Sequence, residues 1–295
     1  MTPPILISMP GNEQMTKRLS ALTGAEVAAL ETRPFPDGET YVRLITGVSG
    51  RDVAIVCTLD HPNDKFVPLA FTAAVAREFG ASRVGLIAPY LAYMRQDHRF
   101  KEGEAVTCTH FAHLISNSFD WLVTVEPHLH RHASLDEVYA IPSKVVHADA
   151  ALAHWIRDNV RDPLIVGPDL ESAQWAGRIA AVAQCPYVVL TKRRLGDREV
   201  QIDIPDMSAW RERQPLLIDD IISSAATMIE AARLLAAAGM RRPICVGIHG
   251  IFAADSYGLL KVAAARVATA NTVAHESNEI DLSALIADAV LPLAT

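Results

Sequence analysis

The chain has little cysteine, few aromatic residues and a deficit of positive charge. Its 295 residues include 4 cysteines, 6% aromatic residues, and 27 Lys and Arg against 34 Asp and Glu, which gives a net charge of −7. A sequence-independent grip on nucleic acid needs a large basic surface, so this charge argues against nucleic acid as a partner. An anionic substrate would have to be held by a local group of Arg, Lys, backbone N–H groups or a metal ion.

The cysteines also lack the spacing of a metal site. Cys57, Cys108, Cys185 and Cys245 lie far apart and form no C-x-x-C pair, so a structural zinc site is not expected. Their apolar or helical settings are typical of buried free thiols in a reducing compartment. The first residues of the sequence lack the basic segment and the apolar run that are typical of a signal peptide. No apolar run in the sequence is close to the ~18–20 residues that are needed to cross a bilayer. We therefore expect a soluble, cytoplasmic protein with no membrane partner.

Short apolar runs alternate with longer helical patterns along the whole chain. Residues 52–59, 83–90 and 214–220 are apolar at most positions, as in strands covered on both faces. Helical patterns lie between such runs, for example over residues 63–79, where Gly80 supplies a stop signal. This alternation predicts an α/β fold with parallel sheets.

The alternating pattern restarts near residues 140–149. A chain of this length fits about two domains. We therefore expect two similar Rossmann-like domains, an N-terminal one over residues 1–145 and a C-terminal one over residues 146–295.

The strongest local signal lies at residues 216–235. A buried strand runs into Asp219 and Asp220, then into the small residues 223–227, and then into a helix. Small side chains let backbone N–H groups point at a phosphate, and the helix N-terminus adds a favourable dipole. The two carboxylates can contact ribose hydroxyls or a hydrated Mg²⁺. The alternative is an ordinary β-to-α turn, but a tandem Asp pair directly after a buried strand is costly without a partner.

Two cations follow another strand. Lys192 and Arg194 are two residues apart, so in an extended segment they share one side, with Arg193 on the other. Arg offers a fork of donors and Lys a mobile point charge, and both can stabilise charge on a transferring group. The alternative is a solvated basic turn.

His128 and Asp169 each follow a predicted buried strand. Mg²⁺ prefers oxygen, so a histidine would contact it weakly or through water. His128, His130 and His132 alternate, which also suits a transition-metal site. That interpretation is less favoured, because His130 and His132 are expected in a loop.

Six segments of the chain, in order, resemble the ribose-phosphate pyrophosphokinase (phosphoribosyl pyrophosphate synthetase) family, in its archaeal-type branch or as a divergent bacterial member. They are FPDGETYVRL (35–44), APYLAYMRQDHRFKEGEAV (88–106), TVEPHLH (124–130), GPD (167–169), TKRRLGDREVQI (191–202) and the segment at 216–235. The resemblance implies two phosphoribosyltransferase-type domains, Mg²⁺ dependence and a role in nucleotide biosynthesis. It also implies a kinase-type transferase that moves the β,γ-diphosphoryl group of ATP to the 1-hydroxyl of ribose 5-phosphate.

The resemblance also implies a role for each matched residue. In the N-terminal domain, the residues implied to bind ATP are Arg95, Gln96, Asp97 and His128. The residues implied to complete the adenine pocket of a neighbouring subunit are Phe35, Asp37 and Glu39. Such a shared pocket requires a homo-oligomer of at least two chains. In the C-terminal domain, ribose 5-phosphate is bound by Asp169, Asp219, Asp220, Ser223, Ser224, Ala225, Ala226 and Thr227. His128 and Asp169 would contact the metal, and Lys192 and Arg194 would be catalytic residues on a flap.

The phosphate turn departs from the family pattern of Ser/Asp-Thr-Gly/Ala/Cys-Gly-Thr. Ala226 stands at the second glycine position. This matters if residue 226 needs a positive φ or close phosphate approach, whereas a helical φ would make alanine inexpensive. Two alternatives therefore stay open, a non-catalytic regulatory subunit that resembles the synthetase and a phosphoribosyltransferase of the same fold.

Overall fold

The computed structural model describes residues 3–99, 101–129, 131–194 and 200–293, which form two compact units. Unit 1 contains residues 3–146, 272–274 and 282–293, and unit 2 contains residues 147–271 and 275–281. The first crossing between units lies close to the boundary expected at residue 145. Residues 282–293, expected in the C-terminal domain, contain a helix that packs in unit 1.

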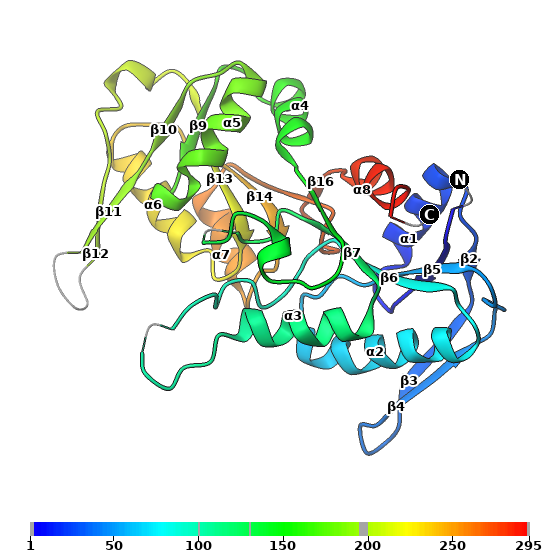
Figure 1. The fold of residues 1–295 in the computed structure, drawn as a ribbon. Helices are drawn as coiled ribbons and strands as arrows, with labels where there is room; N and C mark the ends of the chain where they lie inside the picture. The colour runs from blue at the N-terminus through cyan, green and yellow to red at the C-terminus, as the bar shows by residue number, and fades with distance from the viewer. Residues whose placement is uncertain (1–2, 100, 130, 195–199, 294–295) are drawn as a thin grey trace. The chain divides into compact units, whose positions relative to one another are not determined.

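Unit 1 is built on a six-stranded parallel sheet with the order β2-β1-β5-β6-β7-β8 (Figure 1). Its four inner strands, β1, β5, β6 and β7, are almost wholly buried, which explains their unbroken apolar runs. Their bounds are β1 (Ile5–Ser8), β2 (Val27–Ala28), β5 (Asp52–Val56), β6 (Arg83–Ala88), β7 (Trp121–Val125) and β8 (Ser143–Val146).

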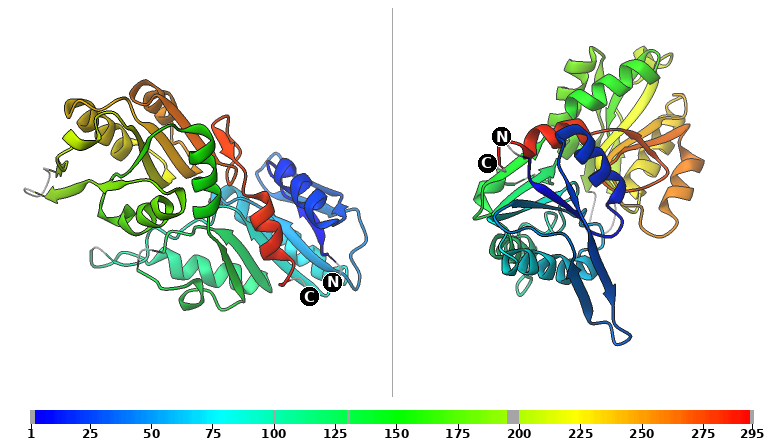
Figure 2. Two further views of the ribbon diagram at one scale, coloured as in Figure 1. Left: turned by 90° about the horizontal axis from the view of Figure 1, so that it is seen from above. Right: turned by 90° about the vertical axis from the view of Figure 1, so that its right-hand side faces the viewer.

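Helices cover this sheet in two pairs. α1 (Glu13–Thr23) lies beside α8 (Ser283–Val290), which also contacts β7 and β8 (Figures 1 and 2). α2 (Pro62–Glu78) contacts α3 (Thr107–Ser118). Ile286, Ala287 and Val290 of α8 are buried, and this apolar burial holds the end of the chain in unit 1.

A two-stranded antiparallel hairpin projects from unit 1 (Figure 2). It consists of β3 (Leu30–Pro34) and β4 (Thr40–Leu44), with the predicted turn between them. The Arg33 guanidinium lies over the rings of Phe35 and Tyr41, at 5.0 and 4.7 Å from their centroids. These cation–π contacts stiffen the outer part of the hairpin.

Unit 2 repeats the architecture, with a parallel sheet in the order β10-β9-β13-β14-β15-β16. The strands are β9 (Pro163–Gly167), β10 (Tyr187–Val189), β13 (Gln214–Ile222), β14 (Ile244–Gly250), β15 (Arg266–Ala270) and β16 (Asn278–Ile280). The helices are α4 (Asp149–Asn159), α5 (Ala173–Ala183), α6 (Ala226–Ala237) and α7 (Ser256–Ala263). The described residues also form three 3₁₀ turns, η1 (Leu135–Glu137) in unit 1 and η2 (Leu170–Ser172) and η3 (Ser208–Trp210) in unit 2.

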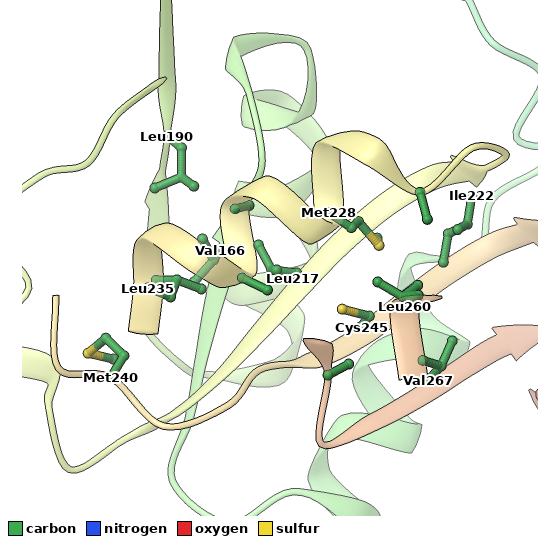
Figure 3. Packing of buried hydrophobic residues seen from close by; sticks show 14 of the residues in the cluster. Val166, Leu190, Leu217, Ile222, Met228, Leu235, Met240, Cys245, Leu260 and Val267 are labelled. Atoms are coloured by element: carbon green, nitrogen blue, oxygen red, sulfur yellow. The ribbon is translucent and has the colours of Figure 1, made fainter. Parts of the chain in front are cut away.

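The core of unit 2 fixes α6 on its sheet (Figure 3). Met228 and Leu235 of α6 pack with Leu217 of β13 and Cys245 of β14, and all four are buried. The N-terminus of α6, where a phosphate is expected to bind, is therefore set by an apolar contact.

A second antiparallel ribbon lies between β10 and β13 along the chain. It consists of β11 (Thr191–Arg194) and β12 (Val200–Asp203). The hairpin of unit 1 lies at the matching place, between β2 and β5 along the chain, so the two units share both their strand order and their inserted ribbon.

The structure confirms the predicted α/β class with parallel sheets. Several short elements were not predicted from the sequence, namely β8, the pairing of β11 with β12, α7, β15 and β16. Among the described residues, no helix is long and apolar enough to cross a membrane. All four cysteines are free thiols, and three are buried while Cys185 is partly exposed.

Candidate functional site

In both sheets the first strand lies inside the sheet rather than at its edge. β1 has β2 on one side and β5 on the other, and β9 has β10 and β13 in the same way. The chain therefore turns in opposite directions from these strands, and a crevice opens beyond their carboxyl ends. The residues that follow β1, β5, β9 and β13 are therefore the candidates for a functional site.

In unit 2, Asp169 follows β9 and begins the short turn η2. Its Oδ1 accepts a hydrogen bond of 3.2 Å from the N–H of Ser172, and the Ser172 hydroxyl donates to the Asp169 carbonyl at 2.6 Å. This reciprocal cap gives Asp169 a structural role besides any ligand contact. The cap also fixes the direction of its carboxylate.

Asp219 and Asp220 lie inside β13, and the sheet holds them close together. The N–H of Asp220 donates to Oδ1 of Asp219 at 3.0 Å, and the N–H of Ile221 donates to Oδ1 of Asp220 at 2.8 Å. Burial, and then the charges of Asp220 and Asp169, raise the pKa of Asp219 well above its usual value. The three predicted carboxylates of unit 2 therefore form one electrostatic group that a bound cation or a set of hydroxyl donors would stabilise.

The turn that follows β13 has its unusual backbone at Ala225. This residue has φ 58° and ψ 4° in the left-handed region, and α6 begins at the next residue. Ala226 is the first helical residue, and its N–H reaches Oγ of Ser224 at 3.5 Å. Alanine at the second glycine position, residue 226, thus costs little free energy, because its backbone is helical. The strained backbone is at Ala225 instead.

Lys192 and Arg194 occupy alternate positions of β11. They are paired with Ile202 and Val200 of β12 across the ribbon. The ribbon is thus an antiparallel pair rather than the simple basic turn of the alternative interpretation. Residues 195–199 lie outside the described part of the chain.

In unit 1, Arg95, Gln96 and Asp97 lie in the loop after β6. The Asp97 side chain is only 2% exposed. Nη1 of Arg131 donates hydrogen bonds to Oδ1 and Oδ2 of Asp97, at 2.9 and 3.2 Å. His98 adds a contact of 2.8 Å from Nδ1. Burial acts to raise the pKa of Asp97, but the hydrogen bonds from His98 and Arg131 and the charge of Arg131 outweigh it and hold this pKa below its usual value.

Arg131 is a residue that the sequence analysis missed. It follows the PHLH segment, and its charge was the only signal available there. Its pairing with Asp97 ties the loop after β7 to the loop after β6. Gln96 is held as well, since its Oε1 accepts a hydrogen bond of 3.0 Å from the Thr107 hydroxyl at the start of α3.

The histidines of the loop after β7 do not share one environment. His128 is partly buried, whereas Nδ1 of His132 lies 3.1 Å from Oε2 of Glu137. His130 lies outside the described residues. No group of three or more His, Cys, Asp or Glu side chains in the described part of the chain is arranged to hold a metal ion.

The hairpin of unit 1 borders a cavity of about 910 Å³ at the carboxyl ends of β1 and β5. Its lining includes Met9 and Cys57 after these strands, Arg33 and Glu39 from the hairpin, and Val67 and Phe71 from α2. Phe35 and Asp37 lie at the hairpin turn outside this lining, with the Phe35 residue 39% exposed. The three predicted adenine-pocket residues are therefore exposed on a projecting element, and of the three only Glu39 lines this cavity.

We expect Asp219→Asn to stabilise the protein when Mg²⁺ and substrates are absent. The raised pKa means that Asp219 stabilises the fold fully below the unfolded-chain value of about pH 4 and loses this contribution as pH rises through its native pKa. Thermal unfolding at several pH values should show the variant's advantage growing from about pH 4 upward. Asp288→Asn, at an exposed position of α8, is the control and should show no such trend.

We expect glycine substitutions at positions 225 and 226 to act in opposite directions. Ala225→Gly relieves a left-handed alanine and should stabilise the protein by up to about 1 kcal/mol. Ala226→Gly loosens the first helical residue and should destabilise it by up to about 1 kcal/mol. Denaturant unfolding of both variants measures the difference, and loss of stability in both would contradict the described turn.

Two family models together match nearly the whole chain. One, described as the N-terminal domain of ribose phosphate pyrophosphokinase, matches residues 5–118, and one described as a phosphoribosyl transferase domain matches residues 134–284. The chain is 32% identical over 285 residues to a ribose-phosphate pyrophosphokinase of Sulfolobus acidocaldarius, covering 94% of this chain and 96% of the relative. It is 30% identical to that of Methanothermobacter thermautotrophicus, covering 96% and 99%.

A solved structure has the same fold throughout. Phosphoribosylpyrophosphate synthetase from Mycobacterium smegmatis matches with a TM-score of 0.86 at 20% identity, over 99% of this chain and 98% of the other. At 20% identity, the match supports a shared fold and nothing further.

Proposed function

The chain belongs to the ribose-phosphate pyrophosphokinase family, and from this premise we propose that it transfers the β,γ-diphosphoryl group of ATP to the 1-hydroxyl of ribose 5-phosphate. The sugar oxygen attacks the β-phosphorus, and the bond to the oxygen that bridges the α and β phosphorus atoms breaks. The products are phosphoribosyl pyrophosphate and AMP, which makes the protein a transferase of nucleotide biosynthesis.

The observation that carries this proposal is the arrangement at the end of β13. Asp219 and Asp220 lead into a tight turn whose last residue, Ala225, caps α6. The backbone N–H groups at the start of α6 suit the 5-phosphate, and the carboxylates suit the ribose hydroxyls. Ser223, Ser224 and Thr227 add hydroxyl groups at the same turn.

The flap residues supply the positive charge that the reaction needs. Both substrates are anionic, whereas the protein carries a net charge of −7, so cations must be concentrated locally. We assign this to Lys192 and Arg194 of β11, which would neutralise the transferring group. Most of the rate enhancement in such a reaction comes from positioning the substrates and neutralising charge.

In unit 1 the proposed ATP site uses Arg95, Gln96 and His128, with Asp97 anchored by Arg131. Arg95 is exposed, so its guanidinium is accessible to a nucleotide. The Asp97–Arg131 pair gives the loop after β6 a fixed shape. A rigid loop keeps the positioning cost of binding low.

Mg²⁺ fits the donors that the described residues provide. Mg²⁺ needs only one or two protein carboxylates, because substrate phosphates and water complete its shell. The carboxylates of unit 2 offer hard oxygen ligands, and the raised pKa of Asp219 marks a place where a cation is favourable. Within unit 2, Asp169 would hold the ion. When bound, Mg²⁺ neutralises charge on the phosphate oxygens.

The exposed hairpin supports a homo-oligomer, a dimer or larger. Phe35 is a half-exposed aromatic residue on a stiff projecting element, and Asp37 and Glu39 flank the same turn. We propose that these residues complete the adenine pocket of a neighbouring subunit. The four free thiols also support a cytoplasmic location, since free cysteine persists in reducing compartments.

The test is an acceptor screen on the purified protein with ATP and Mg²⁺. Ribose 5-phosphate should yield AMP and phosphoribosyl pyrophosphate, both identified by mass. A folded sample that forms no AMP with any pentose phosphate would contradict the proposal. Tight binding to a separate active synthetase would then favour the regulatory subunit, and base-dependent release of pyrophosphate would favour a phosphoribosyltransferase.

We expect Lys192→Ala to lower kcat by about 100-fold or more, because it removes a cation that acts on developing charge. The KM for ribose 5-phosphate should change little, since the sugar phosphate is assigned to the turn after β13. Arg193→Ala is the matched control, one position away on the same strand. Steady-state kinetics of both variants decide the assignment, and equal activity in the two would remove Lys192 from the mechanism.

A further inference from the structure

The loop that joins β14 to α7, together with the first residue of α7, donates hydrogen bonds to the turn after β13. The Ser223 carbonyl accepts hydrogen bonds from the N–H of Ala253 at 3.1 Å and from the Ser256 hydroxyl at 2.7 Å. The preceding carbonyl, of Ile222, accepts from the N–H groups of Ile251 and Phe252, both at 3.0 Å. Both carbonyls at the start of the turn thus receive two donors each from one loop.

These bonds fix the direction of the peptide groups in the turn. In a trans peptide, the carbonyl of one residue and the N–H of the next point in opposite directions. Because Ser256 and Ala253 hold the Ser223 carbonyl toward the loop, the N–H of Ser224 is directed away from that loop. An outward N–H in this turn is what an anionic ligand requires.

The loop that supplies these donors is itself rigid. The Phe252 ring contacts the rings of Tyr257 and His275, with centroid distances of 4.9 and 4.5 Å. Phe252 and Ala254 have φ values of 42° and 49°, which non-glycine residues adopt only when their surroundings enforce them. The Ser256 residue is 4% exposed, so water does not readily replace its hydroxyl as a donor.

We infer that Ser256 is a positioning residue for the phosphate of ribose 5-phosphate. It acts through the Ser223 carbonyl, which it keeps turned away from the ligand, and it does not touch the substrate. The inference rests on the proposed function and deepens it, because it assigns part of the sugar-phosphate affinity to a loop outside the six recognised segments.

The test compares Ser256→Ala with Ser20→Ala. Ser20 is the matched control, because its hydroxyl also donates to a backbone carbonyl, that of Ala25, at 2.7 Å in unit 1. Calorimetric titration with ribose 5-phosphate, without ATP, should show about fivefold weaker binding for Ser256→Ala and unchanged binding for Ser20→Ala. In kinetics, the KM for ribose 5-phosphate should rise by a similar factor, while kcat and the KM for ATP stay near their wild-type values.

Wild-type binding of Ser256→Ala, or equal weakening in both variants, would overturn the inference. Ser256→Cys keeps the volume and offers only a weak donor, so it should give an intermediate affinity and replaces Ser256→Ala if that variant does not fold. Binding is measured without turnover. A wild-type protein that binds ribose 5-phosphate but forms no AMP would therefore contradict the proposed reaction and leave the role of Ser256 intact.

Discussion

The position of the first strand inside each parallel sheet decides where the loops at the carboxyl ends of the strands lie. The first strand of each unit, β1 or β9, lies inside its sheet, because the chain leaves it first toward one edge and then toward the other. The two directions leave a crevice beyond β1 and β5 in unit 1 and beyond β9 and β13 in unit 2. The carboxylates and the phosphate turn lie at the second of these places, and the cavity beside the hairpin lies at the first.

The two crevices have different chemistry although their frameworks match. In unit 2, β13 leads into small residues and a helix N-terminus, which suits an anion. In unit 1, β5 leads toward Asp60, whose carboxylate is paired with Lys65, and α2 carries Asp64 in its first turn. A carboxylate in that first turn occupies the favourable end of the helix dipole and repels a phosphate. The start of α2 therefore does not repeat the anion-binding arrangement at the start of α6.

Charge is organised locally in a protein whose net charge is negative. Asp97 is stabilised in its ionised form by Arg131, whereas Asp219 is destabilised by burial and by its neighbours. The first arrangement rigidifies a loop, and the second leaves a place where a ligand or cation gains free energy by binding. The loop before α7 and Ser256 add a third element, since their hydrogen bonds to two carbonyls direct the N–H of Ser224 away from that loop.

Apolar periodicity and local runs of residues were enough to predict the α/β class and most of the helices and buried strands from the sequence, and the site motifs are predictions of the same kind. The Asp219–Asp220 pair and the small residues after it are one continuous segment, so their strand-turn-helix form could be predicted. Contacts and backbone angles in the folded structure show that α8 packs in unit 1, that Arg131 pairs with Asp97, that Ala225 rather than Ala226 has the left-handed backbone, and that Ser256 donates a hydrogen bond to the turn. Each of these depends on contacts between residues far apart in the sequence or on a backbone angle that packing imposes, and neither has a local pattern.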